Sequence, residues 1–344
     1  MFEKTVKAIR SGRSPILFTS LSGSSMGVTA LLDGDRSYGD ESIIRPIPSD
    51  TKLPVILDDV LVERITTAPH LVLCGAGHVS VYTAKIAKMV GFKVTVIDER
   101  TDFANSERFP EADAIVNLPY REALEAINDP NTYYVIVTRG HKDDNLCLET
   151  ILNKPYTYCG MIGSKSKVQI VFYDLIARGY PKEKLNTVHS PIGLSIGANT
   201  PEEIAVCIVG EMIQVKNDSD RGCEWDAALC DAIQSLRKPY AMVTLIDKKG
   251  SAPRSTGARM IVKRDGTIIS SVGGGFGEFE AAQHAQEMLN NHANAKRYTC
   301  MMNNTDAASK GMICGGVIDI LIQDRKSTRL NSSHPTTSRM PSSA

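Results

Sequence analysis

Residues 71–98 read LVLCGAGHVSVYTAKIAKMVGFKVTVID, in which a short apolar run, a glycine pair, an amphipathic segment and a β-branched run follow one another. This order predicts strand, tight turn, helix and strand, the beginning of a parallel sheet covered by helices. Gly75 permits the tight turn, and Gly77 permits a phosphate to approach the backbone closely, where the N–H groups and dipole of the following helix favour an anion. Asp98 ends the second strand, where an acid usually accepts hydrogen bonds from a ribose.

The same motif has two features that weaken a simple dinucleotide assignment. Ser80 stands where the pattern usually has a third glycine or alanine. Fold alone does not determine function, so the alternative is a Rossmann-like fold with a vestigial pocket. We favour nucleotide or pterin-phosphate binding, with His78 as a further candidate contact.

The strand and helix alternation continues to about Asn217 through VTVID, AIV, YYVIVT and YTYCGMIG. It predicts an α/β fold, a Rossmann-like doubly wound parallel sheet over residues 61–217, closed by a helix that begins at Asn199–Glu203. Two loops at carboxyl ends of strands carry candidate ligand contacts, since open α/β sheets bind ligands there: Arg139, His141, Ser164 and Lys165. For His78 and His141 a hydrogen-bonded imidazole is favoured over a metal ligand, and no dedicated metal cage is predicted, because no His or Cys partner lies at ligand spacing.

The segments that flank this domain resemble each other. Residues 4–40 and 230–274 each run through helix, strand, loop and a hairpin that turns at Asp-Gly. We interpret residues 1–60 as a degenerate scaffold half and residues 222–324 as the loop-rich half, and expect the two to form one smaller α+β domain. The alternative is chance similarity between short α/β segments.

Three glycine-rich loops lie in the C-terminal half: GSAPRSTGAR at 250–259, GGGFGE at 273–278 and GMICGG at 311–316. Each places free backbone N–H groups beside a hydroxyl, guanidinium or thiol, the composition of an anion-binding nest. The alternative for any one cluster is a tight turn in a β-rich domain. Three clusters in one short domain favour a binding site, with these candidate residues: Ser251, Arg254, Arg259, Gly273, Gly274, Gly275, Glu278, Cys314, Gly315 and Gly316.

Composition argues against several classes of function. The 39 basic and 39 acidic residues cancel, so no charge imbalance indicates nucleic acid or a membrane surface. No apolar run reaches the roughly 20 residues of a membrane span, and the N-terminus lacks a signal-like apolar core, so we expect a cytoplasmic protein. The eight cysteines include no C-x-x-C pair and are predicted to be reduced and mostly buried.

Residues 325–344 differ in composition from the rest of the chain. They are dominated by Ser and Thr, have no apolar period, and resemble a translated cloning read-through. We therefore expect a non-native disordered tail and discount His334 as a ligand.

Long runs of this sequence resemble the XdhC/CoxI family, whose members assist xanthine dehydrogenase. GSAPRSTGARM, SVGGGFGE and GMICGG resemble the loops of its XdhC/CoxI domain, and 75–113, 137–144, 160–167 and 189–205 resemble its Rossmann-like domain. The loop-rich domain usually precedes the Rossmann-like one in this family, but here it follows. The family's interdomain geometry is therefore not carried over to this chain.

The resemblance implies a chaperone that binds molybdenum cofactor, molybdopterin or its dinucleotide form, during sulfuration and insertion into a molybdenum hydroxylase, with a cysteine desulfurase as a further partner. On this hypothesis Gly273–Gly275 and Arg254 hold the phosphate, and Glu278 accepts from pterin nitrogens or from Arg259. Cys314 serves as a soft ligand or sulfur relay, unless it packs as a small apolar residue.

Two other functions stay open at this point. An NAD(P)-dependent oxidoreductase would use Gly75, Gly77 and Asp98, with His141 as its candidate acid or base. A purely structural docking partner of the hydroxylase would bind no cofactor. The sequence does not distinguish a monomer from a homodimer.

Overall fold

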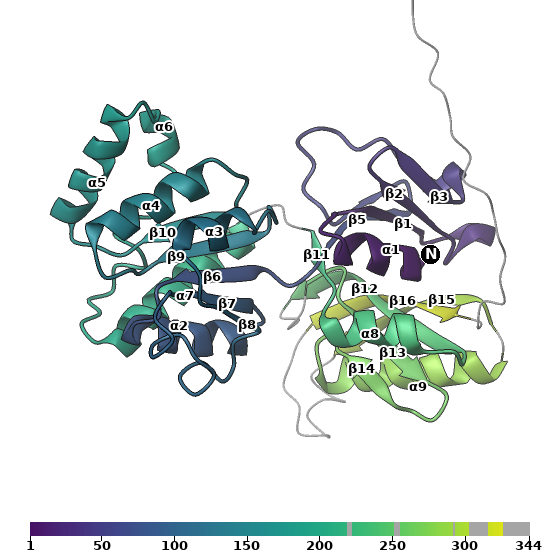
Figure 1. Ribbon diagram of the computed structural model, residues 1–344. Coiled ribbons are helices and arrows are strands. Elements are labelled where there is room, and N and C mark those ends of the chain that lie inside the picture. The colour runs from purple at the N-terminus through teal and green to yellow at the C-terminus, as the bar shows by residue number, and fades with distance from the viewer. Residues whose placement is uncertain (219–221, 251–254, 292, 303–315, 326–344) are drawn as a thin grey trace, which may run out of the picture. The chain divides into compact units, whose positions relative to one another are not determined.

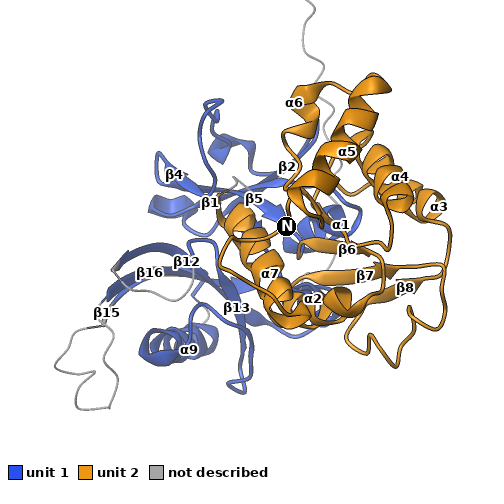
Figure 2. Cartoon of the chain, turned by 90° about the vertical axis from the view of Figure 1, so that its left-hand side faces the viewer, with its two compact units in different colours: residues 1–67, 220–344 blue, residues 68–219 orange. Residues whose placement is uncertain are grey.

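The computed structural model describes residues 1–218, 222–250, 255–291, 293–302 and 316–325 (Figure 1). The chain divides into two compact units, coloured separately in Figure 2. Unit 2 is residues 68–219, and unit 1 combines residues 1–67 with residues 220–344. The N-terminal and C-terminal segments therefore belong to one unit, as the sequence predicts.

Unit 2 is built on a parallel sheet whose strands lie in the order β10-β9-β6-β7-β8. The strands are β6 (His70–Cys74), β7 (Lys93–Ile97), β8 (Ala114–Val116), β9 (Thr132–Ile136) and β10 (Tyr158–Met161). The chain steps outward from β6 to β8 and then returns to the other side of β6 for β9 and β10, and every pairing is parallel. This order confirms the predicted doubly wound sheet, with its topological switch point between β6 and β9.

Helices cover both faces of this sheet because its strands are apolar on both sides. One core cluster packs α2 (His78–Met89) and α7 (Pro201–Asp218) against residues such as Leu73 and Tyr133. The other packs α3 (Tyr120–Glu125), α4 (His141–Leu152), α5 (Lys165–Ala177) and α6 (Lys182–Leu185) against residues such as Val72 and Tyr134. Neighbouring residues of one strand thus pack against helices on opposite faces of the sheet. Each fully buried apolar side chain contributes roughly 1.5–3 kcal/mol to the stability of the fold.

The predicted closing helix begins where the sequence indicates. α7 starts at Pro201, and the side chains of Thr200 and Glu203 bond reciprocally to each other's backbone N–H groups at 3.3 and 3.2 Å. This capping box satisfies donors that the first turn of a helix otherwise leaves unpaired.

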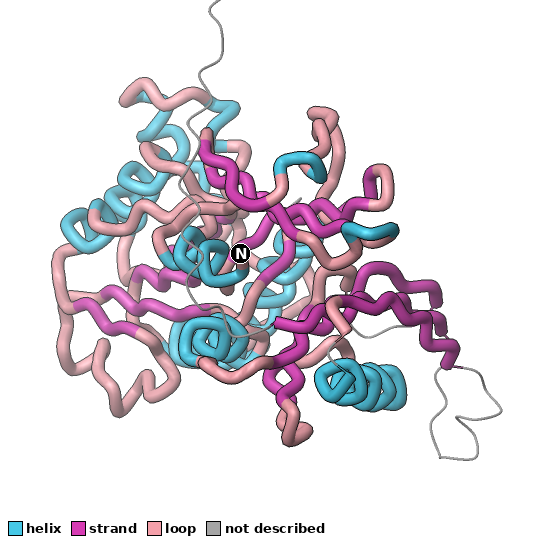
Figure 3. The backbone as a smooth tube through the Cα atoms, turned by 90° about the vertical axis from the view of Figure 1, so that its right-hand side faces the viewer, coloured by secondary structure: helices cyan, strands magenta, loops and turns pink. Residues whose placement is uncertain are grey.

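Unit 1 contains two sheets, whose strands are among those coloured magenta in Figure 3; all their pairings are antiparallel except that of β11 with β5, which is parallel. The first has the order β11-β5-β1-β2-β3, with β4 also paired to β5, and includes β1 (Ile16–Ser20), β2 (Thr29–Asp33), β3 (Arg36–Gly39), β4 (Val55–Leu57), β5 (Val60–Thr66) and β11 (Cys223–Glu224). The second has the order β14-β13-β12-β16-β15, formed by β12 (Tyr240–Gly250), β13 (Arg259–Lys263), β14 (Ile268–Ser270), β15 (Ala295–Met302) and β16 (Gly316–Arg325).

Helices α1 (Phe2–Arg10) and α8 (Ala227–Ser235) share one core with both sheets. Phe2 meets the fully buried Trp225 edge-to-face, with ring centroids 5.7 Å apart. The remaining long helix, α9 (Gly275–Asn291), packs on the second sheet in a separate cluster. Two 3-10 turns, η1 (Gly23–Ser25) and η2 (Glu41–Ile43), lie in the N-terminal segment.

The N-terminal segment extends further into unit 1 than residue 60. β5 runs to Thr66 because it pairs with β1 through five residues and with β11 at its end, so the boundary falls after Thr67. Among the described residues every cysteine is free and buried, in agreement with the prediction from composition.

Candidate functional site

The glycine turn after β6 lies against the end of β9. Gly75 has φ +113°, and a Cβ built on it would lie 2.5 Å from the carbonyl oxygen of Val137. Only glycine fits there, because both the backbone conformation and the neighbouring backbone exclude a side chain. The two loops at the switch point are therefore in direct contact.

Gly77 occupies the opposite kind of environment. A Cβ at Gly77 would meet no atom within 4 Å, and no side chain caps the first turn of α2. The first turn of α2 thus has no side-chain cap, and it begins beside this open space at the positive end of a twelve-residue helix. His78, the first residue of α2, is exposed. This cradle has the donors and the room that a phosphate requires.

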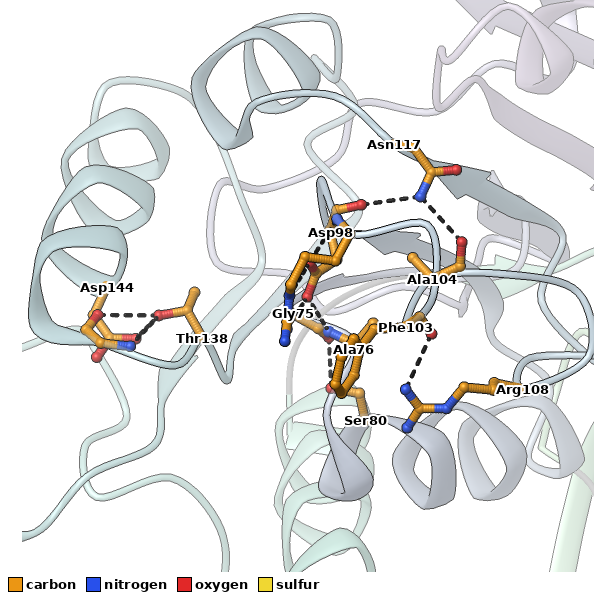
Figure 4. A network of polar contacts seen from close by, with 12 residues as sticks. Gly75, Ala76, Ser80, Asp98, Phe103, Ala104, Arg108, Asn117, Thr138 and Asp144 are labelled. Atoms are coloured by element: carbon orange, nitrogen blue, oxygen red, sulfur yellow. Dashed lines mark hydrogen bonds and ion pairs between the residues drawn. The ribbon is translucent and has the colours of Figure 1, made fainter.

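The Asp98 carboxylate is already occupied by donors of the protein (Figure 4). Its Oδ2 accepts from the Ala76 N–H at 2.9 Å and from Arg100 at 2.7 Å, and its Oδ1 accepts from the Arg100 backbone N–H and Nε at 3.1 and 2.8 Å. Burial alone would raise the pKa of Asp98, but these hydrogen bonds hold it below its ordinary value. In this conformation Asp98 holds the glycine turn in place, and its contact with a ribose stays a prediction.

Residues 100–117 contribute contacts that the sequence motif did not indicate. Two guanidinium groups lie over the Phe103 ring, with the Arg100 and Arg108 carbons 4.0 and 4.9 Å from its centroid. Asn117 donates to the carbonyl oxygens of Asp98 and Ala104, each at 3.0 Å. The only sequence signal for this cluster is its place directly after β7, because its contacts depend on how the loop folds.

Ser80 replaces the third glycine of the motif in a structural role. It is fully buried, and its hydroxyl donates to the Gly75 carbonyl at 2.6 Å. The serine thus fixes the glycine turn through its bond to the Gly75 carbonyl and does not occupy the open space beside Gly77.

The predicted residues after β9 and β10 differ in what they contact. Arg139, His141 and Lys165 are exposed at helix N-termini on the carboxyl edge. Ser164 caps α5, accepting from the Lys167 N–H at 3.3 Å. Arg139 lies directly after Thr138, whose backbone borders Gly75, so it is the predicted cation nearest in sequence to the switch point.

A buried carboxylate beneath this edge was not predicted. Asp144 is fully buried in the first turn of α4, accepts from the Thr138 hydroxyl at 2.7 Å and forms an ion pair with Lys167. The pair joins the N-termini of α4 and α5. Lys167 is thus neutralised by Asp144. The two predicted cations, Arg139 and Lys165, are exposed and could meet an anionic ligand here.

In unit 1 three strands of the second sheet, β12, β14 and β15, run in the same direction. Each is separated from the next of the three by one antiparallel strand. Gly316 pairs with both Gly250 and Met302, whereas β13 begins opposite Thr244. The described ends of β12 and β15 are thus offset from the end of β14 by roughly 20 Å along the strands, at about 3.3 Å per residue. Four predicted contacts lie outside the described residues: Ser251, Arg254, Cys314 and Gly315.

The Gly273–Gly275 loop is closed by its own helix. One oxygen of Glu278 accepts from the Ser271 hydroxyl at 2.5 Å and from the Val272 and Gly274 N–H groups at 3.0 and 3.1 Å, while the Gly273 N–H bonds Ser271. Burial alone would raise the pKa of Glu278, but these donors keep it below its ordinary value. A phosphate nest at Gly273–Gly274 is therefore not available in this conformation, since a carboxylate occupies it.

Arg259 is committed to a buried ion pair instead of facing a ligand. Its guanidinium donates to Glu63 Oε1 at 2.9 Å, to Oε2 as well, and to the Gly257 carbonyl at 3.0 Å. Both side chains of the pair are almost fully buried, with Arg259 1% exposed. The predictions that Arg259 grips a phosphate and that it bonds Glu278 are therefore wrong.

These features define a class of protein: a doubly wound unit with a glycine turn and an uncapped helix N-terminus at its switch point, joined in sequence to an α+β unit built on two sheets. The chain belongs to the XdhC and CoxI family. The XdhC Rossmann domain matches residues 71–212, and the XdhC and CoxI family domain matches residues 234–299, together more than half of the chain.

Three relatives show how far the similarity extends. The chain is 34% identical over 156 residues to the uncharacterized protein YqeB of Escherichia coli strain K12, covering 45% of this chain and 28% of that protein. It is 32% identical over 159 residues to a probable subunit of xanthine dehydrogenase from Bacillus subtilis strain 168, covering 46% of each. A crystal structure of a xanthine dehydrogenase from Bacillus halodurans superposes with a TM-score of 0.50 at 26% identity, over 61% of this chain and 64% of that one. The matches thus span less than two thirds of each relative.

Two negative findings apply to the described residues. No helix there combines the length and the apolar character needed to cross a bilayer. Within the same residues, His, Cys, Asp and Glu side chains do not gather in threes or more at a point where they could bind a metal ion.

Proposed function

We propose that this chain binds molybdenum cofactor, as molybdopterin or its dinucleotide form, assists its sulfuration, and hands it to a hydroxylase of the xanthine dehydrogenase type. Membership of the XdhC and CoxI family supports the proposal, as do the names of the two Bacillus relatives, both of which refer to xanthine dehydrogenase. The client hydroxylase and a cysteine desulfurase are the protein partners that this function requires.

The observation that carries the proposal is the open cradle at Gly77. The cofactor ends in a phosphate or pyrophosphate. The first turn of α2 offers N–H donors that no side chain caps, and no neighbouring atom fills the space beside the Gly77 Cα. Arg139 is exposed and directly follows Thr138, whose backbone borders Gly75, so it supplies a positive charge in the loop that contacts the glycine turn. A guanidinium can bind phosphate bidentately. The described residues therefore fit the phosphate end of the cofactor.

When bound, the cofactor supplies a dithiolene-held molybdenum whose sulfido ligand the hydroxylase needs. The α2 amides would hold the phosphate and so orient the cofactor, a step that changes none of its bonds. Cys314, the candidate soft ligand or sulfur relay, belongs to the same proposal and lies outside the described residues.

Mass spectrometry of ligand released from protein purified from a molybdenum-replete host tests the proposal. The expected mass is that of molybdopterin or of its dinucleotide form. The measurement distinguishes these two, since they differ by a nucleotide, and it distinguishes both from NAD(P). The Gly77→Ala variant places a methyl group in the cradle and is expected to retain at least tenfold less pterin. Wild-type protein that carries no pterin, and that does not activate a co-expressed hydroxylase, would refute the function.

An NAD(P)-dependent oxidoreductase is the second candidate, favoured by the Gly75 turn at a Rossmann switch point. Asp98 counts against it, since Arg100 and Ala76 already occupy the carboxylate that would bind the ribose hydroxyls. Purified protein incubated with NADH and an electron acceptor separates the two functions: turnover with tight NADH binding favours the enzyme, and retained pterin without turnover favours the carrier.

A further inference from the structure

The two halves of unit 1 share one order of elements. The N-terminal half runs from α1 to β5 and the C-terminal half from α8 to β16. Both begin with a nine-residue helix, and the interval from the end of the helix to a paired threonine is the same, from Arg10 to Thr19 and from Ser235 to Thr244. β3-β2-β1-β5 in one sheet corresponds to β14-β13-β12-β16 in the other, which is the pattern of an internal duplication.

The strand registers identify which residues correspond. Thr19 pairs with Thr29 as Thr244 pairs with Arg259, so Gly27 and Gly257 both stand two residues before the second strand. In the neighbouring strands, Leu17 pairs with Glu63 and Met242 pairs with Gln323. Glu63 and Gln323 therefore hold the same position in the two halves.

These two positions reach across to each other's half. The Gln323 side chain donates to the Gly27 carbonyl at 2.7 Å. Glu63 binds Arg259, which donates to the Gly257 carbonyl, and Glu63 Oε1 would lie 2.8 Å from a Cβ at Gly257. Each half thus anchors the same glycine of the other, once through a neutral amide and once through a buried ion pair.

The apolar contact between the halves repeats this reciprocity. A separate core cluster consists of four buried residues, two from each half: Leu21, Leu61, Ile246 and Leu321. By the registers, Leu21 corresponds to Ile246, and Leu61 corresponds to Leu321. Equivalent positions therefore meet at the junction, as they do in a symmetric dimer.

The halves differ in the segments that carry the candidate ligand contacts. Between β4 and β5 the N-terminal half has a two-residue turn, Asp58–Asp59, with φ 45° and 57°, where the C-terminal half has residues 303–315. Helix α9, which follows Gly273–Gly275, has only the short η2 as its counterpart. The N-terminal half thus keeps the junction but not the loops.

We propose that Glu63 is a positioning residue, supplied by the N-terminal half, for the segment Ser255–Arg259 of the loop-bearing half. This inference rests on the proposed function, and it assigns the segment to the cofactor site because the segment lies within residues 234–299, which match the XdhC and CoxI family domain. The Glu63–Arg259 pair holds the Gly257 carbonyl from one side, while Cys223 Sγ lies 3.7 Å from the Thr256 carbonyl oxygen. The N-terminal half completes the site in this way without carrying a ligand loop of its own.

The choice of a charged pair at one anchor and an amide at the other has a physical consequence. Glu63 and Arg259 are both removed from water, so each depends on the other, and truncating one leaves a buried charge without a partner. A guanidinium also bonds the carboxylate and the Gly257 carbonyl at the same time, which fixes the segment more strictly than one amide bond can.

The test compares Glu63→Gln with Asp33→Asn, a matched loss of a buried carboxylate in the same half. Asp33 pairs with Arg13 at 2.9 Å and touches no residue of segment 255–259 in that ion pair. Glu63→Gln is expected to exchange the Gly257 and Ala258 amide hydrogens roughly tenfold faster or more, the effect of losing a bond to a charged group, and to retain at least tenfold less pterin. Asp33→Asn is expected to leave both measurements at the wild-type level.

A double variant, Glu63→Gln with Arg259→Met, separates positioning from stability. Replacing a whole buried pair is often neutral for stability, so its Tm is expected to return toward the wild-type value while pterin retention stays low. Retention that recovers together with the Tm would overturn the inference, since Glu63 would then serve stability alone. If wild-type protein holds no pterin, the proposed function fails, and positioning is still tested by exchange: unchanged rates at Gly257 and Ala258 in Glu63→Gln would refute it.

Discussion

Replacing Gly75 by alanine tests how unit 2 is built at its switch point. An alanine at φ +113° carries backbone strain of about 1–3 kcal/mol. Its Cβ would lie 2.5 Å from the Val137 carbonyl oxygen and 2.9 Å from the carbonyl carbon, and relieving such overlap costs about 1–3 kcal/mol more. We therefore expect a loss of about 2–6 kcal/mol, because neither backbone segment can move away without disturbing the pairing of β6 with β9.

Gly77→Ala is the matched control, since its Cβ meets no atom within 4 Å. Gly77 is the N-cap of α2, where glycine is somewhat favoured over alanine, so Gly77→Ala should lower the free energy of unfolding by under about 1 kcal/mol. In thermal unfolding, the Tm of Gly75→Ala should fall by about 4–24 °C, at about 2–4 °C per kcal/mol for a domain of this size. Amide exchange in β6 and β9 should show that the loss is in unit 2. Pterin retention should fall in Gly77→Ala while its stability is preserved. Equal Tm values for the two variants would refute the described contact between Gly75 and Val137.

Three further predictions concern titratable groups. Glu278→Gln should lower the stability of unit 1 by about 1–2 kcal/mol in urea unfolding at pH 7. The native pKa of Glu278 lies below its ordinary value of 4.5, so this contribution is present above pH 4.5 and is lost as pH falls through the native pKa. Burial, with Lys93, lowers the pKa of His70 from 6.5 to about 4, so unit 2 should lose stability as pH falls from 6.5 toward 4, and His70→Gln should flatten this pH profile. Asp144→Asn should cost about 1–3 kcal/mol, because it removes the partner of a partly buried lysine, and an unchanged denaturation midpoint would contradict the pairing of Asp144 with Lys167.

The fold could be predicted from sequence to a large extent because its signals are local. Alternating β-branched runs and amphipathic segments indicated the parallel sheet, and Thr200-Pro201 indicated the start of α7. The similarity between the two flanking segments likewise came from short-range order, since each helix, strand and hairpin is contiguous. The boundary of unit 1 was less accessible, because β5 is assigned to it by pairing with β1 rather than by its own composition.

The candidate site was less predictable because residue types do not reveal their partners. Asp98 and Glu278 look like free carboxylates in the sequence. In the structure, a backbone N–H and a guanidinium donate to Asp98, and backbone N–H groups and a hydroxyl donate to Glu278. Arg259 looks like a phosphate ligand, but it is bound to Glu63. In each case a buried or partly buried charge takes a partner from the protein because leaving it unpaired would cost more.

Taken alone, the sequence established the glycine turn, the alternation of strands and helices, and the kinship of the two flanking segments, because each depends on the conformational limits of neighbouring residues. The tertiary structure decided which charges remain available. Glu63 and Arg259 are 196 positions apart, and only the folding of both halves into one unit brings them together. Water is excluded there, so their pairing depends on packing, which no local pattern of residues encodes.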